Sequence, residues 1–257
     1  LFLMKLRRMN VSFITIDEAH CISQWGYDFR PAYLQIANIR KEKLDAPLLA
    51  LTATATPKVI VDIQEKLEFK EKNAFHMSFE RKNLTYVVRN AQDKNEELVH
   101  ILNSVRGCAI VYVRSRKRTR EIAEILNANN IPATFYHAGL EPAVKDERQT
   151  AWQSDVVRVI VATNAFGMGI DKPDVRIVVH MDCPDSLEAY FQEAGRAGRD
   201  GNRSYAVLLY NGGDERKLDK RIVDNFPEKE YIKNVYQSLA FYYEIGIHSG
   251  KGHTFTF

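Results

Sequence analysis

The stretch FITIDEAHCISQWGYDFRPAY, residues 13–33, joins an apolar run to two carboxylates and then to a loop rich in aromatic rings. Its first part belongs to a β-branched and aromatic run at 11–16, and a second such run follows at 48–51. This order predicts a βαβ unit. Because the first strand ends in Asp17 and Glu18, both acids are expected at the carboxyl edge of a parallel sheet, where open α/β folds bind ligands.

Strands and helices alternate along most of the chain. Helical spacing covers 33–43, and Thr56 followed by Pro57 is a good N-cap and first residue for the next helix. Further strands are predicted at 84–88, 109–113, 133–136, 157–162, 175–180 and 205–210. Such alternation indicates an α/β fold with parallel sheets covered on both faces. After residue 210 the pattern changes, and an apolar stripe predicts one more helix, with Ile232, Val235, Tyr236, Leu239 and Tyr243 on one face.

The totals exclude several classes of protein. Lys and Arg number 36 against 33 Asp and Glu, a net charge of +3, so any affinity for nucleic acid must come from clustered charge. The cysteines, Cys21, Cys108 and Cys183, lie far apart with no CxxC pair, which argues against disulfides and a cysteine zinc site. No apolar stretch is long enough to cross a bilayer. We therefore expect a cytoplasmic protein without membrane partners, associated with the nucleoid if it is bacterial.

The acid pair has a chemical interpretation of its own. In a nucleotide hydrolase the first acid, Asp17, would hold Mg²⁺ and the second, Glu18, would polarise the attacking water. The alternative is a pair of acids at a solvated strand end.

Four motifs and two further segments resemble known helicases. They are DEAH (17–20), the loop AHCISQWGYDFRPAY (19–33), TATAT (52–56), FERKNL (79–84), VIVATNAFGMGIDKPDV (159–175) and QEAGRAGRDG (192–201). In this order they resemble the later motifs of superfamily 2 helicases, and the aromatic loop, FERKNL and the last motif resemble those of the RecQ DNA helicases. The resemblance covers almost all of residues 11–210.

The resemblance implies two RecA-like lobes with ATP and Mg²⁺ between them and single-stranded DNA across them. It divides the chain into part of a first, incomplete lobe (1–75), an inter-lobe crossing (76–95), a second lobe (96–210) and the start of a helical accessory module (211–257). It also implies an ATP-dependent helicase that moves 3′ to 5′, separates duplexes in DNA repair and recombination, and works with forked DNA and other repair proteins. The family often carries four zinc-binding cysteines after the second lobe, and none occurs here, so zinc is not expected.

Several residues are expected on the nucleotide side. By resemblance these are Asp17, Glu18 and His20 of DEAH, Gly169 and Asp171, and Gln192, Arg196 and Arg199. A guanidinium delivered across the cleft would neutralise charge that grows on the γ-phosphate, and Arg199 is the first choice for this role with Arg196 next. The alternatives are structural ion pairs for the arginines and a turn or N-cap acid for Asp171.

The aromatic loop is expected to contact DNA through Trp25, Phe29 and Arg30, because bases stack on aromatic and guanidinium planes. Its direct connection to the acid pair would transmit DNA occupancy to Glu18. The family usually has His where Tyr27 stands, so no proton-handling role is assigned to Tyr27. The alternative is that Trp25 and Phe29 fill the core.

A basic cluster, YVRSRKRTRE at 112–121, suits phosphate contacts. The resemblance implies nucleic-acid contacts from Arg114, Ser115, Arg116, His137, Gly139, Thr163 and Asn164. The alternative for about half of the basic residues is a solvated helix face.

The phosphate-binding motif GxxxxGK[ST] does not occur in the chain, and GIHSGKG at 246–252 has the wrong spacing. In the family this loop lies upstream of DEAH, so we expect a fragment that hydrolyses ATP poorly by itself. Two other hypotheses remain: an RNA-remodelling ATPase with the same lobes, and a non-catalytic nucleic-acid-binding piece.

Overall fold

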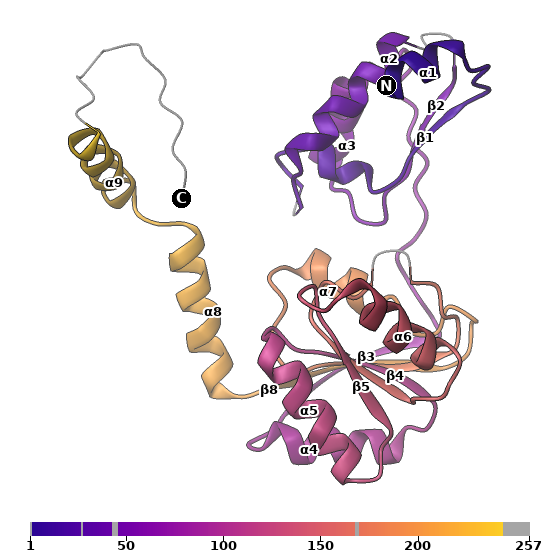
Figure 1. The fold of residues 1–257 in the computed structure, drawn as a ribbon, viewed down its shortest axis with the longest axis vertical. Helices are drawn as coiled ribbons and strands as arrows, with labels where there is room; N and C mark the ends of the chain where they lie inside the picture. The colour runs from indigo at the N-terminus through magenta and orange to yellow at the C-terminus, as the bar shows by residue number, and fades with distance from the viewer. Residues whose placement is uncertain (1, 27, 43–45, 168–169, 244–257) are drawn as a thin grey trace. The chain divides into compact units, whose positions relative to one another are not determined.

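The computed structural model describes residues 2–26, 28–42, 46–167 and 170–243 (Figure 1). Tyr27, Gly169 and the glycine-rich segment 246–252 lie outside the described residues. The chain forms two compact units, Leu1–Tyr210 and Asn211–Phe257.

The first sheet has two parallel strands, β1 (Ile14–Ile16) and β2 (Leu48–Ala50). Around them the chain forms helices α1 (Phe2–Arg8), α2 (Ala37–Glu42) and α3 (Pro57–Lys66) and 3₁₀ helices η1 (Ala19–Ile22) and η2 (Pro31–Ile36). The core beneath the sheet contains Ile16, Ala19, Ile22, Val59, Ile63 and Leu67. The predicted βαβ order is confirmed.

Two local predictions differ in extent from the structure. The strand predicted at 11–16 is only three residues long, because it pairs with the three residues of β2 and leaves Phe13 exposed. The helix predicted at 33–43 is divided between η2 and α2. The start of α3 is as predicted, since the Thr56 hydroxyl accepts a hydrogen bond from the Val59 N–H and Pro57 is the first helical residue.

The second sheet has six strands in the order β3-β8-β7-β4-β6-β5, and every neighbouring pair is parallel. The strands are β3 (Leu84–Asn90), β4 (Cys108–Tyr112), β5 (Ala133–Tyr136), β6 (Val159–Ala162), β7 (Val175–His180) and β8 (Ser204–Tyr210). Helices α4 (Lys94–Ser104) and α5 (Arg116–Ala128) cover one face, and α6 (Pro142–Gln153) and α7 (Leu187–Ala194) cover the other (Figure 1). All five residues of the central strand β4 are buried, as expected for a sheet covered on both sides.

Strand β3, predicted at 84–88, lies at the edge of the six-stranded sheet. It lies inside the segment 76–95 that the sequence assigns to an inter-lobe crossing, yet it pairs with β8 over seven residues. The edge of the second sheet therefore begins at Leu84, before the second lobe expected from residue 96. The chain enters this edge strand from the short polar and aromatic stretch that precedes Leu84.

The strand order creates a switch point beside β4. The chain runs from β4 through β5 to β6 on one side, then returns to β7 and β8 on the other side. After the carboxyl end of β4 the chain therefore leaves toward β6 and β5, whereas after the carboxyl end of β7 it leaves in the opposite direction, toward β8. Ligands of open α/β sheets bind at such a point.

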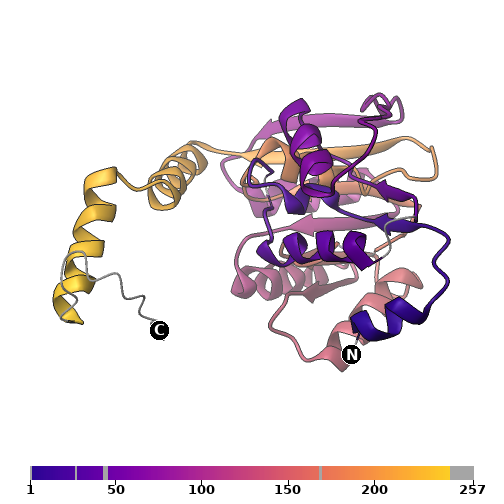
Figure 2. The same ribbon diagram turned by 90° about the horizontal axis from the view of Figure 1, so that it is seen from above.

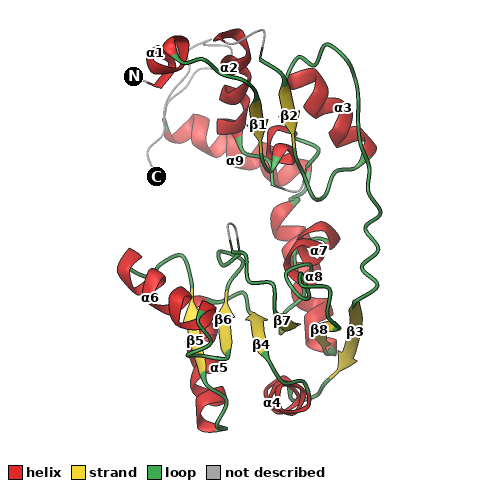
Figure 3. Cartoon of the chain, turned by 90° about the vertical axis from the view of Figure 1, so that its right-hand side faces the viewer, coloured by secondary structure: helices red, strands yellow, loops and turns green. Residues whose placement is uncertain are grey.

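The second compact unit contains helices α8 (Gly212–Asn225) and α9 (Lys229–Tyr242), which Figures 2 and 3 show as consecutive helices. Asn211 and Asp214 form a capping box at the start of α8. The predicted apolar stripe lies on α9, where Ile232 and Tyr236 are exposed. Among the described residues, the helices are too short or too polar to span a bilayer.

Candidate nucleotide and nucleic-acid site

Asp17 and Glu18 follow β1 directly, at the carboxyl edge predicted for them. Glu18 adopts a left-handed backbone conformation, with φ of 50°, which costs a non-glycine residue about 1–2 kcal/mol. The Glu18 backbone N–H donates a hydrogen bond to the Asp17 carboxylate at 2.8 Å, so the side chain of Asp17 contacts the backbone of Glu18. Two adjacent carboxylates with hard oxygen donors fit a Mg²⁺ ion, and Asp17 is the residue that would hold it.

His20 of the DEAH motif is buried and connects this motif to TATAT. Its Nδ1 lies 3.0 Å from the Thr52 hydroxyl and 3.4 Å from the Glu18 carboxylate. Burial lowers the pKa of His20, so the neutral imidazole is favoured. His20 is therefore hydrogen-bonded to Thr52 and lies beside the Glu18 carboxylate. Thr52 is a site residue that sequence reasoning did not single out, although the TATAT motif was the available signal.

Trp25 of the aromatic loop is 61% exposed, so it does not fill the core as the alternative interpretation required. The Lys58 Nζ lies 3.1 Å from the centre of its ring, a cation–π contact from the first turn of α3. The Trp25 N–H donates to the Ser23 hydroxyl at 3.2 Å. Sequence reasoning missed Lys58, because nothing in the order of residues places it over Trp25.

Arg30 is held within the same loop. Its guanidinium donates to Asp28 at 2.6 and 3.1 Å, and its backbone N–H donates to the Cys21 carbonyl at 2.8 Å. The Asp28 bond raises the pKa of Arg30, so the charge is permanent. Phe29 beside it is half-buried. A phosphate that binds Arg30 would compete with Asp28.

Three potential metal ligands meet below this loop. His20, Cys21 and Asp28 place one ligand atom each within 4.8 Å of one another. However, burial raises the pKa of the Cys21 thiol to about 11, and Asp28 is already engaged by Arg30. The cluster is explained as a hydrogen-bonded support of the loop, and we assign no metal to it.

The two arginines of the last motif have different surroundings. Arg196 is buried and its Nη1 donates to the Gly167 carbonyl, while its Nε has no hydrogen-bond partner among the described residues. Gly167 has φ of 151°, and a Cβ there would collide with this guanidinium. Arg196 is therefore held by a backbone carbonyl, and the described residues show no ion pair to it.

Arg199 keeps a partly exposed side chain. Its Nη1 donates to the Ile170 carbonyl at 3.2 Å and to the Asp171 carboxylate at 3.0 Å. Asp171 itself is largely exposed and does not begin a helix. Arg199 therefore makes the ion pair that the structural alternative describes, and of the two arginines its side chain is the more exposed.

Gln192 links the two halves of the predicted nucleotide site. It lies on α7, and its Nε2 donates to the Glu18 carboxylate at 3.2 Å across 174 residues of sequence. The contact brings the helix that precedes Arg199 to the acid that follows β1.

The switch point of the six-stranded sheet holds a pocket of about 100 Å³. Arg114 and Asn164, two predicted nucleic-acid residues, line it with Asp182 and Asp185. The Asp182 carboxylate accepts from the Arg114 N–H at 3.2 Å, and Asp185 pairs with the Arg114 guanidinium at 2.6 Å. The two acids were missed, although their position just after β7 was a signal for this edge of the sheet.

The cluster at 112–121 contains a helix cap and basic residues that pair with acids on their own helix. Ser115 caps α5 by accepting from the Arg118 N–H, whereas Lys117 and Arg120 pair with acids on their own helix at 3.6 and 2.8 Å. Lys117 and Arg120 therefore lie on a solvated helix face, which was the alternative interpretation for about half of the basic residues.

Arg116, His137 and Gly139 lie together. A Cβ on Gly139 would lie 2.8 Å from the Arg116 guanidinium, so the glycine permits this approach. Burial and the charges of Arg116 and Arg148 lower the pKa of His137. The His137 Nδ1 has no hydrogen-bond partner among the described residues, and Thr163 is buried, with its N–H directed to the Tyr136 carbonyl at 3.3 Å.

Comparison with known proteins places this geometry in a family. Residues 93–201 match the model of the helicase conserved C-terminal domain. The chain is 41% identical over 245 residues to the ATP-dependent DNA helicase RecQ of Bacillus subtilis, which covers 93% of this chain. It is 42% identical over 238 residues to the ATP-dependent helicase SGS1 of Saccharomyces cerevisiae, which covers 89% of this chain. The chain belongs to the RecQ family of helicases.

This RecQ-family chain spans 42% of the Bacillus relative and 16% of the yeast relative. The fold is also similar to that of a solved structure, S. cerevisiae Dbp5 bound to RNA and ADP BeF3. The TM-score is 0.65 at 20% identity, over 88% of this chain and 61% of that one. At that identity the likeness shows the fold alone, an α/β arrangement of the RecA-like kind.

Proposed function

We propose that the protein carrying this chain is an ATP-dependent DNA helicase that moves 3′ to 5′ on single-stranded DNA and separates duplexes. It would act in repair and recombination at forked DNA, with other repair proteins as partners. It would be found in the compartment that holds the genomic DNA. The observation that carries the proposal is the hydrogen bond from Gln192 to Glu18, at 3.2 Å. It supports a shared site for the acid pair and the helix before Arg199, as a nucleotide clamped between two elements requires.

Each residue on the nucleotide side has a distinct task. Asp17 would hold Mg²⁺, which when bound would neutralise negative charge on the phosphates. Glu18, whose carboxylate lies 3.4 Å from the His20 Nδ1, would accept the proton of the attacking water. Arg199 would leave Asp171 for the γ-phosphate and stabilise the charge of the transition state. A change of partner costs little here, because the Arg199–Asp171 pair is largely solvated.

The nucleic-acid side combines a stacking ring with phosphate contacts. Trp25 is exposed on a loop that continues directly from the acid pair, so a base that stacks on its ring would shift the position of Glu18 through the loop. Arg114 and Asn164 at the switch-point pocket, and the group of Arg116 with His137, would track the backbone. Asp182 and Asp185 hold Arg114 until a phosphate replaces them.

The test measures ATP turnover of the genome-encoded protein with single-stranded DNA, with RNA of the same sequence, and without nucleic acid. Glu18→Gln and Arg199→Ala should each lower stimulated turnover by about 10³-fold or more, the scale expected for a missing finger. Two variants are matched controls. Glu68→Gln alters another glutamate in left-handed backbone conformation, and Arg203→Ala alters an exposed arginine close in sequence to the finger. Both should keep full turnover.

The outcomes separate the hypotheses. Stronger stimulation by RNA than by DNA would favour the RNA-remodelling alternative. Undiminished turnover in Glu18→Gln would refute the catalytic assignment. Strand separation on substrates with only a 3′ or only a 5′ single-stranded tail tests the polarity, and unwinding from the 5′ tail alone would contradict it.

A further inference from the structure

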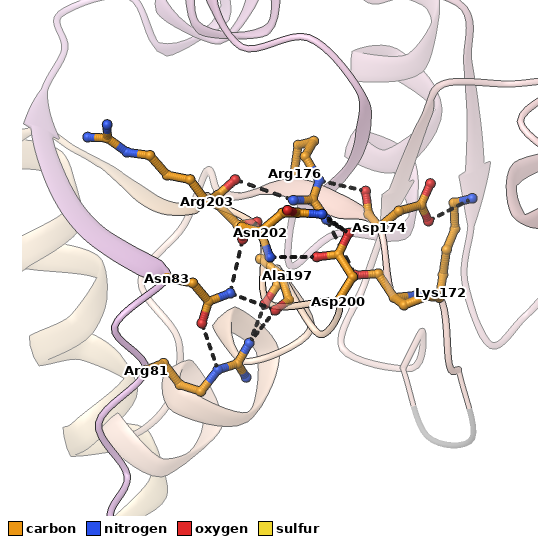
Figure 4. Close-up of polar contacts among 12 residues, drawn as sticks. Arg81, Asn83, Lys172, Asp174, Arg176, Ala197, Asp200, Asn202 and Arg203 are labelled. Atoms are coloured by element: carbon orange, nitrogen blue, oxygen red, sulfur yellow. Dashed lines mark hydrogen bonds and ion pairs between the residues drawn. The ribbon is translucent and has the colours of Figure 1, made fainter.

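The segment just before β3 contacts the loop that carries Arg199, more than 110 residues away in sequence. The Arg81 Nη2 donates to the Ala197 and Gly198 carbonyls at 3.1 and 2.7 Å, and its Nη1 lies 3.5 Å from the Gly195 carbonyl. Figure 4 shows this guanidinium directed at the backbone of the loop, with Asn83 beside it. We call residues 195–202 the finger loop.

Asn83 adds a second set of bonds. Its Nδ2 donates to the Gly198 carbonyl at 2.7 Å and to the Asn202 carbonyl at 3.0 Å. From the same segment, the Phe79 ring lies edge-on to Phe191 of α7, with centroids 5.6 Å apart. Three side chains of one short segment therefore hold α7 and the loop that follows it.

These bonds satisfy carbonyls of the loop that follows α7. Helix α7 ends at Ala194, and its last carbonyls accept from the backbone N–H groups of Gly195, Arg196 and Ala197. The carbonyls of Ala197, Gly198 and Asn202 lie beyond the helix and accept from Arg81 and Asn83. Gly198 has φ of 64°, and a Cβ there would lie only 2.6 Å from the Asn83 Nδ2. The finger loop and Asn83 thus fit together without space for a side chain.

The other side of the finger loop is also held. Arg176 pairs with Asp200 at 2.6 Å (Figure 4). The backbone N–H groups of Gly198 and Asp200 donate to the carbonyls of Val175 and Pro173 at 2.9 and 3.1 Å. Arg199 stands between two fixed residues, so its backbone is constrained while its side chain stays partly exposed.

We propose that Arg81 and Asn83 are positioning residues for Arg199, which set the backbone from which the finger reaches the γ-phosphate. This inference rests on the proposed function, because it assumes that Arg199 is the finger. An electrostatic catalyst must be held near its working geometry, and displacement by about 1 Å costs about 10²-fold in rate. Neither residue touches the nucleotide in this role.

The experiment compares Arg81→Ala, Arg81→Lys and Asn83→Ala with Lys82→Ala, whose side chain is exposed between the two. Hydrogen exchange of the amides at 198–201 is measured in the genome-encoded protein without nucleotide, together with kcat and KM for ATP. Arg81→Ala should speed exchange by at least about tenfold and lower kcat by about 10²-fold with KM within about twofold. Arg81→Lys should recover part of kcat, because a lysine retains the charge but not the planar fork. Lys82→Ala should match the parent.

Several results would overturn the proposal. If Arg81→Ala and Asn83→Ala keep the exchange and the kcat of Lys82→Ala, the two residues do not position the finger. If exchange rises but kcat is unchanged, they are structural only. If Arg81→Ala does not fold, Asn83→Ala alone decides, since it removes two of the bonds. Full turnover in Arg199→Ala would instead refute the finger itself, and the exchange data would still show whether the segment holds the loop.

Discussion

The finger loop and the aromatic loop carry the two side chains most expected to meet a ligand, and they are held in different ways. Around Arg199, backbone carbonyls and N–H groups are bonded from both sides, by Arg81 and Asn83 and by the carbonyls of Pro173 and Val175, just before and at the start of β7. Trp25 is positioned by the hydrogen bond from its backbone N–H to the Ser23 hydroxyl and by Lys58, whose ammonium group lies over the ring. A charge acting at fixed distance needs a fixed backbone, whereas a stacking ring tolerates adjustment.

The largest expected effect tests the tight side of this comparison. Gly198→Ala should lower the free energy of unfolding by about 2–4 kcal/mol, because it combines left-handed backbone strain with crowding against Asn83, Ser204 and Asn202 at 2.6–2.9 Å. Gly201→Ala is the control, since φ is 81° there and nothing lies within 4 Å of an added Cβ. Its cost should be about 1–2 kcal/mol. Chemical denaturation measures both, and equal losses would show that the loop is not tightly packed.

The next effect tests the adjustable side. Trp25→Ala should weaken binding of single-stranded DNA by about 1–3 kcal/mol, the value of one stacked base, and leave turnover without DNA unchanged. Most of the stimulation by DNA should be lost. Phe75→Ala, which removes an exposed ring outside the loop, is the control. Fluorescence anisotropy with a labelled oligonucleotide gives the affinity, and equal stimulation in mutant and parent would remove Trp25 from the coupling role.

A smaller effect concerns the lysine over that ring. Lys58→Ala should release the Trp25 ring and change its emission, while the cation–π energy lost is only about 0.5–1 kcal/mol. Lys58→Arg should preserve the contact. The difference spectrum between each protein and its Trp25→Phe partner isolates this ring from buried Trp152. An emission spectrum that is the same with Lys, Arg and Ala would mean that the contact does not form in solution.

The smallest effect is a pH dependence of the finger loop. Hydrogen bonding to Arg176 and Asn202 lowers the pKa of Asp200 from 3.8 to about 2. A carboxylate whose pKa is lower in the folded protein contributes stability that is present above pH about 4 and is lost as the pH falls toward about 2. Asp200→Asn should therefore lower the Tm at neutral pH, and the difference from the parent should shrink as the pH falls below about 4 and vanish below about pH 2. A constant difference across this range would contradict the assigned cause.

Much of the fold was predictable from local signals. Alternating strand and helix patterns predicted the parallel sheets, and Thr56 with Pro57 predicted the start of α3, because N-cap preferences depend on neighbouring residues alone. The strand at 84–88 was also predicted, but its place at the edge of the six-stranded sheet was not, for a non-local reason. Its partner, β8, lies about 120 residues away, and pairing between strands leaves no mark in the sequence next to Leu84.

The amino-acid sequence by itself determined the α/β class, the motifs and hence the family, because these depend on which residues occur at which spacing. It also placed Asp17 and Glu18 at a strand end, since a strand and its terminus are local features. Only the tertiary structure decided which arginine stays exposed, that Lys58 covers Trp25, and that Arg81 and Asn83 hold the finger loop. Those outcomes depend on contacts between segments far apart in sequence, and only the packing of strands and helices brings such segments together.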